Sequence, residues 1–225
     1  MNNKKIKISL CINLIIFIMV IFASIAMFTG FKFMHGIEPK LESTKIGMFR
    51  FFTVDSNVFM GIMALVFVIK EIELLKGELD EIPTKFYILK LMSTTGVVLT
   101  FLTVFGYLGP ISKGGIPSMI RNSNLFFHLL IPLLSIINFT VFERTNKLVF
   151  KHSFCGIIPT LIYAAYYSIN VFLHMENGKV STLYDWYWFV QGGVWQFVIV
   201  SPLMLAVTYI ISLLLWRFNK KKLDI

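Results

Sequence analysis

Long apolar runs are the feature that most constrains how this chain can fold. A helix needs about 20 largely apolar residues to cross a lipid bilayer, and six segments fit that length. They cover residues 10–31, 48–69, 86–108, 125–142, 154–172 and 188–216. Hydrophobic residues fill 56% of the 225 positions, which is too many for an ordinary soluble domain. The sequence therefore predicts an all-α, polytopic membrane protein, with residues 1–225 forming a single six-helix transmembrane domain.

The positive charge of the chain indicates its orientation in the membrane. The formal net charge is +9, from 21 Lys and Arg against 12 Asp and Glu. These basic residues form short groups between the apolar runs, with neither a basic stripe nor a nucleic-acid-binding motif, so we expect no nucleic-acid partner. Most of them fall at the N-terminus, in the second and fourth connections and at the C-terminus. Because cytoplasmic loops carry the excess of Lys and Arg, we predict a multi-pass protein of the cell membrane with both termini cytoplasmic.

Polar side chains stand where the second apolar run begins. Thr53, Asp55, Ser56 and Asn57 place two hydroxyls, a carboxylate and an amide at the start of a predicted spanning helix. In the predicted topology this start lies at the outer membrane face, beside polar residues of the third to sixth runs. Hydrocarbon cannot satisfy hydrogen bonds, so such side chains normally face other helices. The pattern predicts a bundle with a polar interior in its outer half, to which the first run contributes little.

Helical spacing gathers some of these polar residues on shared faces. Thr53 and Asn57 are four residues apart, and so are Asn124 and His128, so each pair is predicted to share a helix face. The residues expected to support a site or to contact a substrate are Asn57, Ser56, Asn124, Tyr107, Tyr167 and Asn170.

A hydroxyl and an imidazole at similar predicted depth suggest a chemistry. A threonine hydroxyl is a weak nucleophile until a base takes its proton, and a neutral imidazole is a common base. His128 is the only histidine within a predicted span. Thr53 and His128 are thus a candidate nucleophile and base, with Asn124 positioned to hold the ring in one tautomer. Ser56, Asn57 and Tyr167 are alternative donors to an oxyanion.

The same residues also have a purely structural interpretation. Intramembrane Thr commonly bonds back to its own helix, and a set of Thr, Asn and His can simply link helices. Asp55 is expected to favour the positive end of the helix dipole, and Asp185 to be a solvated carboxylate near the membrane surface. The aromatic residues around it are expected to form a belt at the outer interface, namely Tyr184, Trp186, Tyr187 and Trp188. We expect no cofactor and no metal, because neither cysteine has metal-ligand spacing.

Three segments resemble a known family. They are FFTVDSN at residues 51–57, STTGV at residues 93–97 and NLFFHLLIP at residues 124–132. In these segments the chain is similar to bacterial six-helix proteins related to the androgen-induced-gene family of intramembrane threonine hydrolases. The resemblance implies cleavage of a lipid acyl ester, of the fatty acid ester of hydroxy fatty acid type. It also implies that Thr53 is the nucleophile and His128 the base.

Residues and resemblance together lead to one main hypothesis and two alternatives. The main hypothesis is a membrane hydrolase that cleaves an ester bond of a membrane lipid entering from the outer leaflet. The first alternative is a non-catalytic transporter, or a protein that binds a lipid or small solute in the polar cluster. The second is a purely structural membrane protein. The sequence leaves open which ester is cleaved, whether acyl transfer replaces hydrolysis, the oligomeric state and the physiological role.

Overall fold

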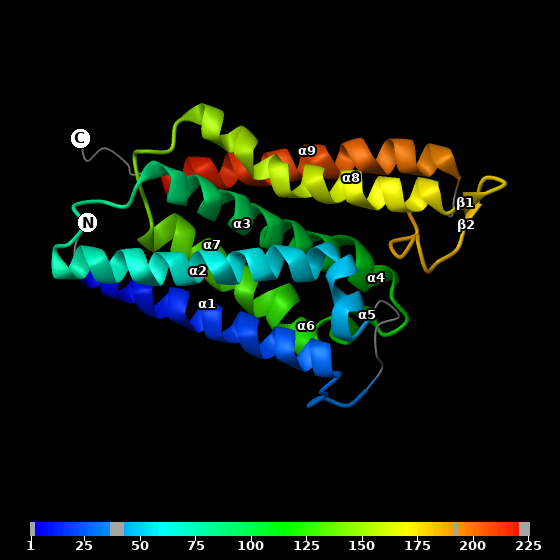
Figure 1. Cartoon of the computed structure of the whole chain (residues 1–225), viewed down its shortest axis with the longest axis horizontal. Helices are drawn as coiled ribbons and strands as arrows, with labels where there is room; N and C mark the ends of the chain where they lie inside the picture. The colour runs from blue at the N-terminus through cyan, green and yellow to red at the C-terminus, as the bar shows by residue number, and fades with distance from the viewer. Residues whose placement is uncertain (1–2, 37–42, 191–192, 221–225) are drawn as a thin grey trace.

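Long helices lying side by side make up most of the structure, a computed structural model that describes residues 3–36, 43–190 and 193–220. They extend along the longest axis of the molecule (Figure 1). The five longest elements are α1 (Asn3–Thr29), α2 (Phe52–Lys76), α3 (Thr84–Thr103), α8 (Ile158–Leu173) and α9 (Val194–Asn219).

Another helical rod is built from four short pieces. These are α6 (Ser123–Leu125), the π-helix η3 (Phe126–Leu130), α7 (Ile131–Ile137) and the π-helix η4 (Asn138–Phe142). Pro132 accounts for the first π-helix, because a proline lacks an N–H and its ring clashes with the carbonyl four residues earlier, here that of His128. A wider π turn relieves that clash. Pro110 has the same effect on the end of α3, which continues through the π-helix η2 (Val104–Leu108) into α4 (Gly109–Ile111).

The remaining described elements are short. They are the 3-10 helices η1 (Lys45–Arg50) and η5 (Phe150–Ile157), the helix α5 (Gly115–Met119) and the strands β1 (Met175–Glu176) and β2 (Lys179–Val180). The two strands pair antiparallel as a small hairpin after α8.

Five helical segments are long and apolar enough to cross a membrane: Asn3–Thr29, Thr84–Ile111, Ser123–Phe142, Phe150–Leu173 and Trp195–Asn219. The predicted all-α, membrane type of fold is therefore confirmed. The helix α2 packs within the same bundle but is not one of these five, so six spanning helices stay a prediction. The last helix begins at Val194, six residues after the predicted start at Trp188, and residues 191 and 192 of that predicted run lie outside the described part.

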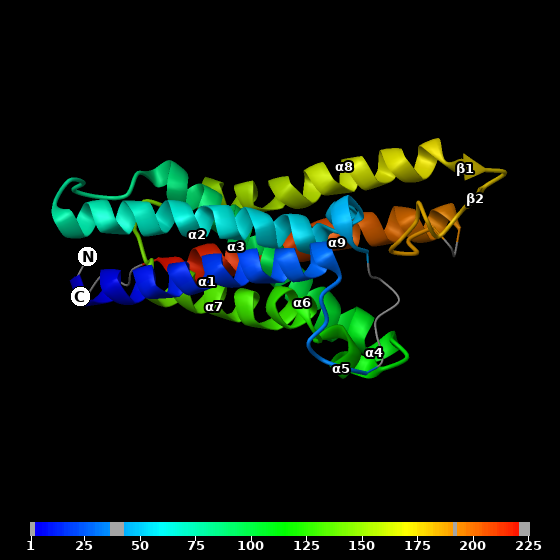
Figure 2. The same ribbon diagram turned by 60° about the horizontal axis from the view of Figure 1, so that its bottom comes forward.

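The helix α3 lies at the centre of the bundle. Its best membrane-length stretch is 61% buried, against 22–39% for the other four candidate spans. It contacts α2, α7, α8 and α9, and Gly96 brings it close to α2, since a Cβ there would meet Ser56 Cβ at 3.1 Å. Small residues allow such close approach between membrane helices. The helix α1 packs against α2, as Figure 1 and the turned view in Figure 2 both show.

The outer faces of the helices are apolar, as lipid requires. On α1, residues spaced three or four apart point inward, among them Ser9, Asn13 and Ile16. On the opposite face Ile18 and Ile25 are 56% and 58% exposed. A continuous exposed apolar surface of this kind is rare on a soluble protein and suits contact with acyl chains.

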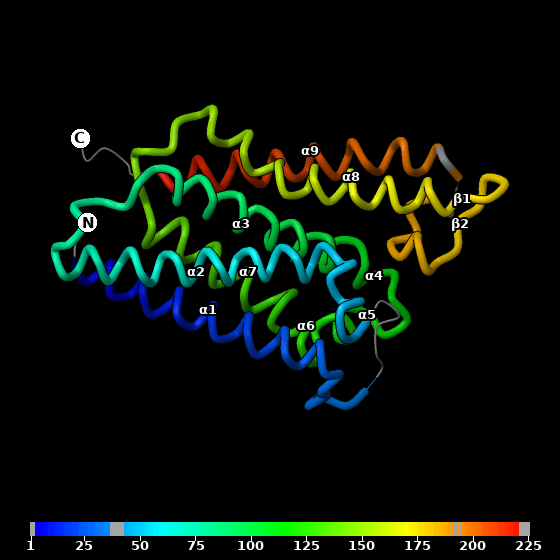
Figure 3. The backbone as a smooth tube through the Cα atoms, in the orientation of Figure 1, coloured from blue at the N-terminus to red at the C-terminus, as the bar shows by residue number. Residues whose placement is uncertain are grey.

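The two ends of the bundle differ. The start of α1 and the end of α9 lie at the same end, together with the turn between α2 and α3, as the tube in Figure 3 shows. We call this the terminal end. The opposite end carries α4, α5 and the β1–β2 hairpin, and we call it the hairpin end.

Candidate functional site

A pocket of about 410 Å³ lies between α2, α3, α8 and α9. This volume falls within the range of small-molecule sites. Its wall is mostly apolar and aromatic, and Thr53 is part of it. Among the lining residues, Leu102, Tyr107 and Leu203 are 44%, 51% and 57% exposed. The pocket therefore opens through the side of the bundle, where acyl chains would surround it.

Thr53 lies in the first turn of α2 with its hydroxyl uncommitted. Its backbone carbonyl accepts hydrogen bonds from Ser56 Oγ at 3.1 Å and from Asn57 Nδ2 at 2.8 Å. The hydroxyls of Thr94 and Thr95 bond back to their own helix at 2.8 Å, as is common in membrane helices. The residue four before Thr53, Phe49, belongs to η1 rather than to α2, and the Thr53 hydroxyl makes no hydrogen bond to a residue that the structure describes. The hydroxyl is therefore available to a ligand.

His128 is buried in the π-helix η3, with 5% of its surface exposed. Its Nδ1 lies 2.5 Å from the carbonyl oxygen of Met119. A carbonyl only accepts, so Nδ1 carries the proton and donates it, and Nε2 is left as the proton-accepting nitrogen. Met119 thus holds the tautomer, the role that the sequence had suggested for Asn124. Asn124 is buried, and its side chain makes no hydrogen bond among the described residues.

Asn57 ties the start of α2 to the turn that carries His128. Its Nδ2 donates to the carbonyl of Thr53 at 2.8 Å and to that of Phe127 at 3.2 Å. Its Oδ1 is buried and has no partner in the described part of the chain. Thr53 lines the pocket, whereas His128 does not, and no hydrogen bond between their side chains is present. The pairing of nucleophile and base therefore stays a prediction.

The other predicted supporting residues divide between the pocket and its surroundings. Tyr107 and Tyr167 line the pocket. Ser56 lies behind it, with Oγ 3.4 Å from Thr100 Oγ1 on α3. Asn170 lies outside the lining and donates from Nδ2 to the carbonyl of Tyr184 at 2.8 Å.

Asp185 is fully buried, so the expectation of a solvated carboxylate is wrong. It accepts hydrogen bonds from the Tyr167 hydroxyl and from the backbone N–H groups of Phe189 and Val190, the latter two at 2.9 and 3.1 Å. These donors replace water around the carboxylate. Asp185 therefore holds the segment before α9 against the pocket wall.

Two of the aromatic residues expected in the outer belt, Trp186 and Tyr187, turn inward instead. Trp186 is 4% exposed, and its Nε1 donates to the Tyr163 hydroxyl at 3.0 Å. That hydroxyl in turn donates to the carbonyl of Arg50 at 2.6 Å. Tyr187 lines the pocket and accepts from the N–H of Phe52 at 3.0 Å. Burial raises the pKa of Tyr187 to about 12, so the pocket meets a neutral phenol at this point.

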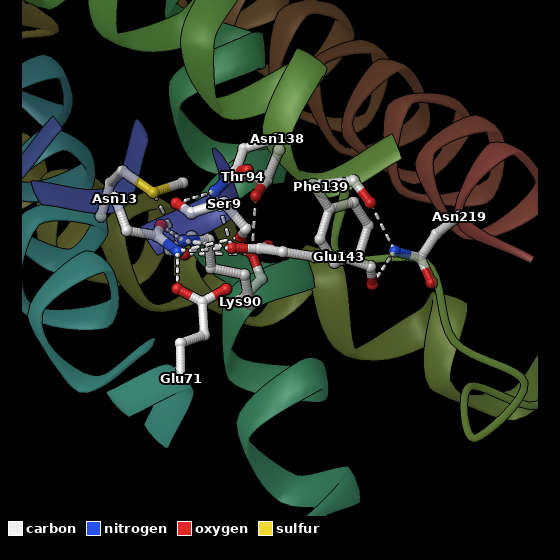
Figure 4. A network of polar contacts seen from close by, with 11 residues as sticks. Ser9, Asn13, Glu71, Lys90, Thr94, Asn138, Phe139, Glu143 and Asn219 are labelled. Atoms are coloured by element: carbon white, nitrogen blue, oxygen red, sulfur yellow. Dashed lines mark hydrogen bonds and ion pairs between the residues drawn. The ribbon is translucent and has the colours of Figure 1, made fainter. Parts of the chain in front are cut away.

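A second polar cluster, at the terminal end, was not predicted. It joins Asn13 of α1, Glu71 of α2, Lys90 of α3 and Glu143 beyond η4, all at most 1% exposed (Figure 4). Helix α1 thus takes part in a polar cluster at the terminal end, through Asn13. Within the described ranges, no group of three or more His, Cys, Asp or Glu side chains is placed to hold a metal ion.

Comparisons of the chain with models of protein families, with curated proteins and with solved structures found no match. The similarity to the androgen-induced-gene family thus depends on the three segments that suggested it.

Proposed function

We propose that this chain is a multi-pass protein of the cell membrane that binds an acyl chain of a membrane lipid in the pocket between α2, α3, α8 and α9. The observation that carries the proposal is an apolar pocket of about 410 Å³ whose rim residues are exposed on the side of the bundle. In a bilayer that rim meets acyl chains, which enter without leaving an apolar medium. The distribution of Lys and Arg supports six spans with both termini cytoplasmic, which would put the hairpin end outside.

The hydroxyls in the pocket wall indicate a lipid that carries an oxygen function along or at the end of its chain. Thr160 lines the pocket, and its Oγ1 is buried with no partner among the described residues. Thr53 and Thr103 also line it, and their hydroxyls make no hydrogen bond within the described part. Unpaired donors in an apolar wall cost free energy unless a ligand satisfies them. An ester carbonyl or a hydroxyl on an acyl chain would do so.

Photocrosslinking in lipid nanodiscs tests this binding. A fatty acyl ester that carries a diazirine on its chain should label peptides of α3 and α9, and excess unlabelled ester should compete. Ala164→Trp should abolish most of this labelling, because Ala164 lines the pocket. Ala165→Trp is the matched control, because Ala165 is exposed on the same helix and is not part of the lining. Equal labelling of the two variants would refute the pocket as the binding site.

A specific observation favours ester hydrolysis as a second function of the same pocket. The Thr53 hydroxyl is unbonded at the pocket wall, and the hydrogen bond to Met119 leaves His128 Nε2 as a proton acceptor. In this mechanism Nε2 takes the Thr53 proton while Oγ1 attacks the acyl carbonyl. The alcohol leaves with the proton from His128, and water then cleaves the acyl-threonine. Because the two side chains are not hydrogen-bonded to each other, catalysis requires them to approach when substrate binds, as in many enzymes without substrate.

Covalent labelling distinguishes hydrolysis from binding alone. A hydrolase-directed fluorophosphonate should modify Thr53 in the wild type and in Thr53→Ser, but not in Thr53→Ala or His128→Ala. Thr103→Ala should keep the modification, because this residue also lines the pocket but has no role as nucleophile. Full ester cleavage by Thr53→Ala would refute the hydrolase, while the crosslinking experiment would still decide the binding proposal.

A further inference from the structure

Among the residues that the structure describes, the buried cluster at the terminal end contains two carboxylates and one cation. Asn13 contacts all three of these charged side chains (Figure 4). Its Oδ1 accepts from Lys90 Nζ at 2.5 Å, and its Nδ2 donates to Glu71 Oε2 at 3.1 Å and to Glu143 Oε1 at 2.9 Å. Fully ionised, these groups would leave one uncompensated negative charge inside the protein. Buried charges are normally paired, because desolvation of an unpaired ion is costly.

The positive charge of Lys90 compensates the negative charge of Glu143. Its Nζ lies 3.2 Å from Glu143 Oε1, and the same oxygen accepts from Asn138 Nδ2 at 2.8 Å and from Asn13. Three donors, one of them charged, therefore surround this carboxylate oxygen. Lys90 Nζ is also 4.7 Å from the centre of the Phe67 ring, in a cation–π contact.

Glu71 has much weaker support. Its side chain points toward Asn13 (Figure 4), and its side-chain hydrogen-bond donors, Asn13 and Ser9, are both neutral. Its Oε1 is buried and has no partner in the described part. The titratable groups that face it are Lys90 and Tyr87 on α3 and Glu143 beyond η4, and Lys90 is committed to Glu143. Helix α1 presents only the neutral Ser9 and Asn13.

We propose that Glu71 is a proton-binding site, and that its carboxyl group is protonated in the folded protein at neutral pH. The bound proton supplies the positive charge that the cluster lacks. The neutral carboxylic acid then lies between the lysine–carboxylate pair and α2, where α1, α2 and α3 meet. Release of this proton requires either a compensating cation or water in the cluster.

Infrared difference spectroscopy of the purified protein in nanodiscs tests this. The wild type should show the C=O stretch of a protonated carboxylic acid at neutral pH, and Glu71→Gln should lose it. Glu73→Gln is the matched control, because Glu73 is partly exposed and paired with Lys70 at 2.8 Å, and it should keep the band. A band absent from the wild type, or lost in Glu143→Gln instead of Glu71→Gln, would overturn the assignment. Loss of the wild-type band on adding sodium or potassium chloride would show a metal-cation site and would also overturn it.

Reversible unfolding gives an independent readout. A carboxyl that is protonated in the folded protein and ionised in the unfolded protein lowers the stability of the fold as pH rises. The folding equilibrium constant then decreases by up to tenfold per pH unit. From mildly acidic to neutral pH, where the unfolded carboxyl is ionised and the folded one keeps its proton, the wild type should show this additional decrease relative to Glu71→Gln. Parallel pH profiles for the wild type and Glu71→Gln would refute the proposal even if both fold well.

Discussion

Replacement of Lys90 by Met should destabilise the protein strongly. Lys90 is fully buried, and its partner Glu143 is 1% exposed, with Nζ and Oε1 3.2 Å apart. The substitution leaves the Glu143 carboxylate without a cation. It also removes the hydrogen bond that Lys90 Nζ donates to Asn13 Oδ1 at 2.5 Å in the wild type. Removal of one partner of a buried ion pair costs about 3–5 kcal/mol, because the other charge stays in the apolar interior. We expect a loss in that range in the free energy of unfolding.

The appropriate assay is reversible unfolding by sodium dodecyl sulfate in mixed micelles, followed by circular dichroism. A double-mutant cycle separates the ion pair from general damage. Lys90→Met with Glu143→Gln removes both charges and keeps an oxygen to accept from Asn138 Nδ2, which donates at 2.8 Å. The double variant should recover about 2 kcal/mol or more relative to Lys90→Met alone. Replacing both members of a buried ion pair by uncharged residues changes the free energy of unfolding little.

The exposed pair between Lys70 and Glu73 provides the control. Their side chains are 25% and 29% exposed at a separation of 2.8 Å. Surface pairs of this kind contribute about 0–1 kcal/mol, so Lys70→Met should cost no more than that. A loss below about 1 kcal/mol for Lys90→Met, or strictly additive losses in the cycle, would refute the assignment of a buried, compensated pair.

Three further substitutions test the segment before α9 and the helix contacts. Asp185→Asn should cost about 1–3 kcal/mol in the free energy of unfolding and weaken lipid crosslinking, because one of its two acceptor oxygens becomes a donor. Tyr163→Phe should cost about 1–3 kcal/mol, since its hydroxyl contacts Arg50 and Trp186 at 2.6 and 3.0 Å. Tyr166→Phe is the comparison, because Tyr166 is 50% exposed. Equal effects of the two substitutions on the free energy of unfolding would contradict this prediction. Gly156→Ala should cost about 1–3 kcal/mol, because the new Cβ would meet Ser212 Oγ at 2.1 Å, whereas Gly106→Ala meets nothing within 4 Å and should be tolerated.

The helices of the bundle were largely predictable, and their ends were less so. Apolar runs long enough to cross a bilayer located five of the spans that the structure contains. The predicted start at residue 10 was late, because the lysines before it continue the helix from Asn3 outside the apolar run. The predicted start at Trp188 was too early, because the apolar run extends beyond the helix, which begins at Val194. Aromatic residues there look like part of a span, yet they fold back over the pocket, held by Asp185.

The sequence placed part of the pocket lining together, and its spacing rule is weakest where the helix changes type. Thr53, Tyr107 and Tyr167 were expected near one another, and all three line the pocket. The rule that residues four apart share a face assumes about 3.6 residues per turn. Residues 126–130 form a π-helix with a wider turn, so the α-helical spacing describes the relative direction of Asn124 and His128 less closely there. The proline that accounts for this change was visible in the sequence, but the contact of His128 Nδ1 with the carbonyl of Met119 was not.

The buried cluster was missed because each of its charges stands near the end of an apolar run. Lys and Glu at such positions are normally solvated or fix the topology, and Lys90 was counted in that way. One signal pointed the other way. Lys90 belongs to a stripe on α3 that continues through Ser93, Thr94 and Gly96, all of them buried. A lysine in line with small residues on the most buried helix has no route to water along that face, so it must have a buried anion as its partner. The identity of that anion follows only from the fold, because Glu143 is 53 positions away and reaches Lys90 through the π-helical end of another rod.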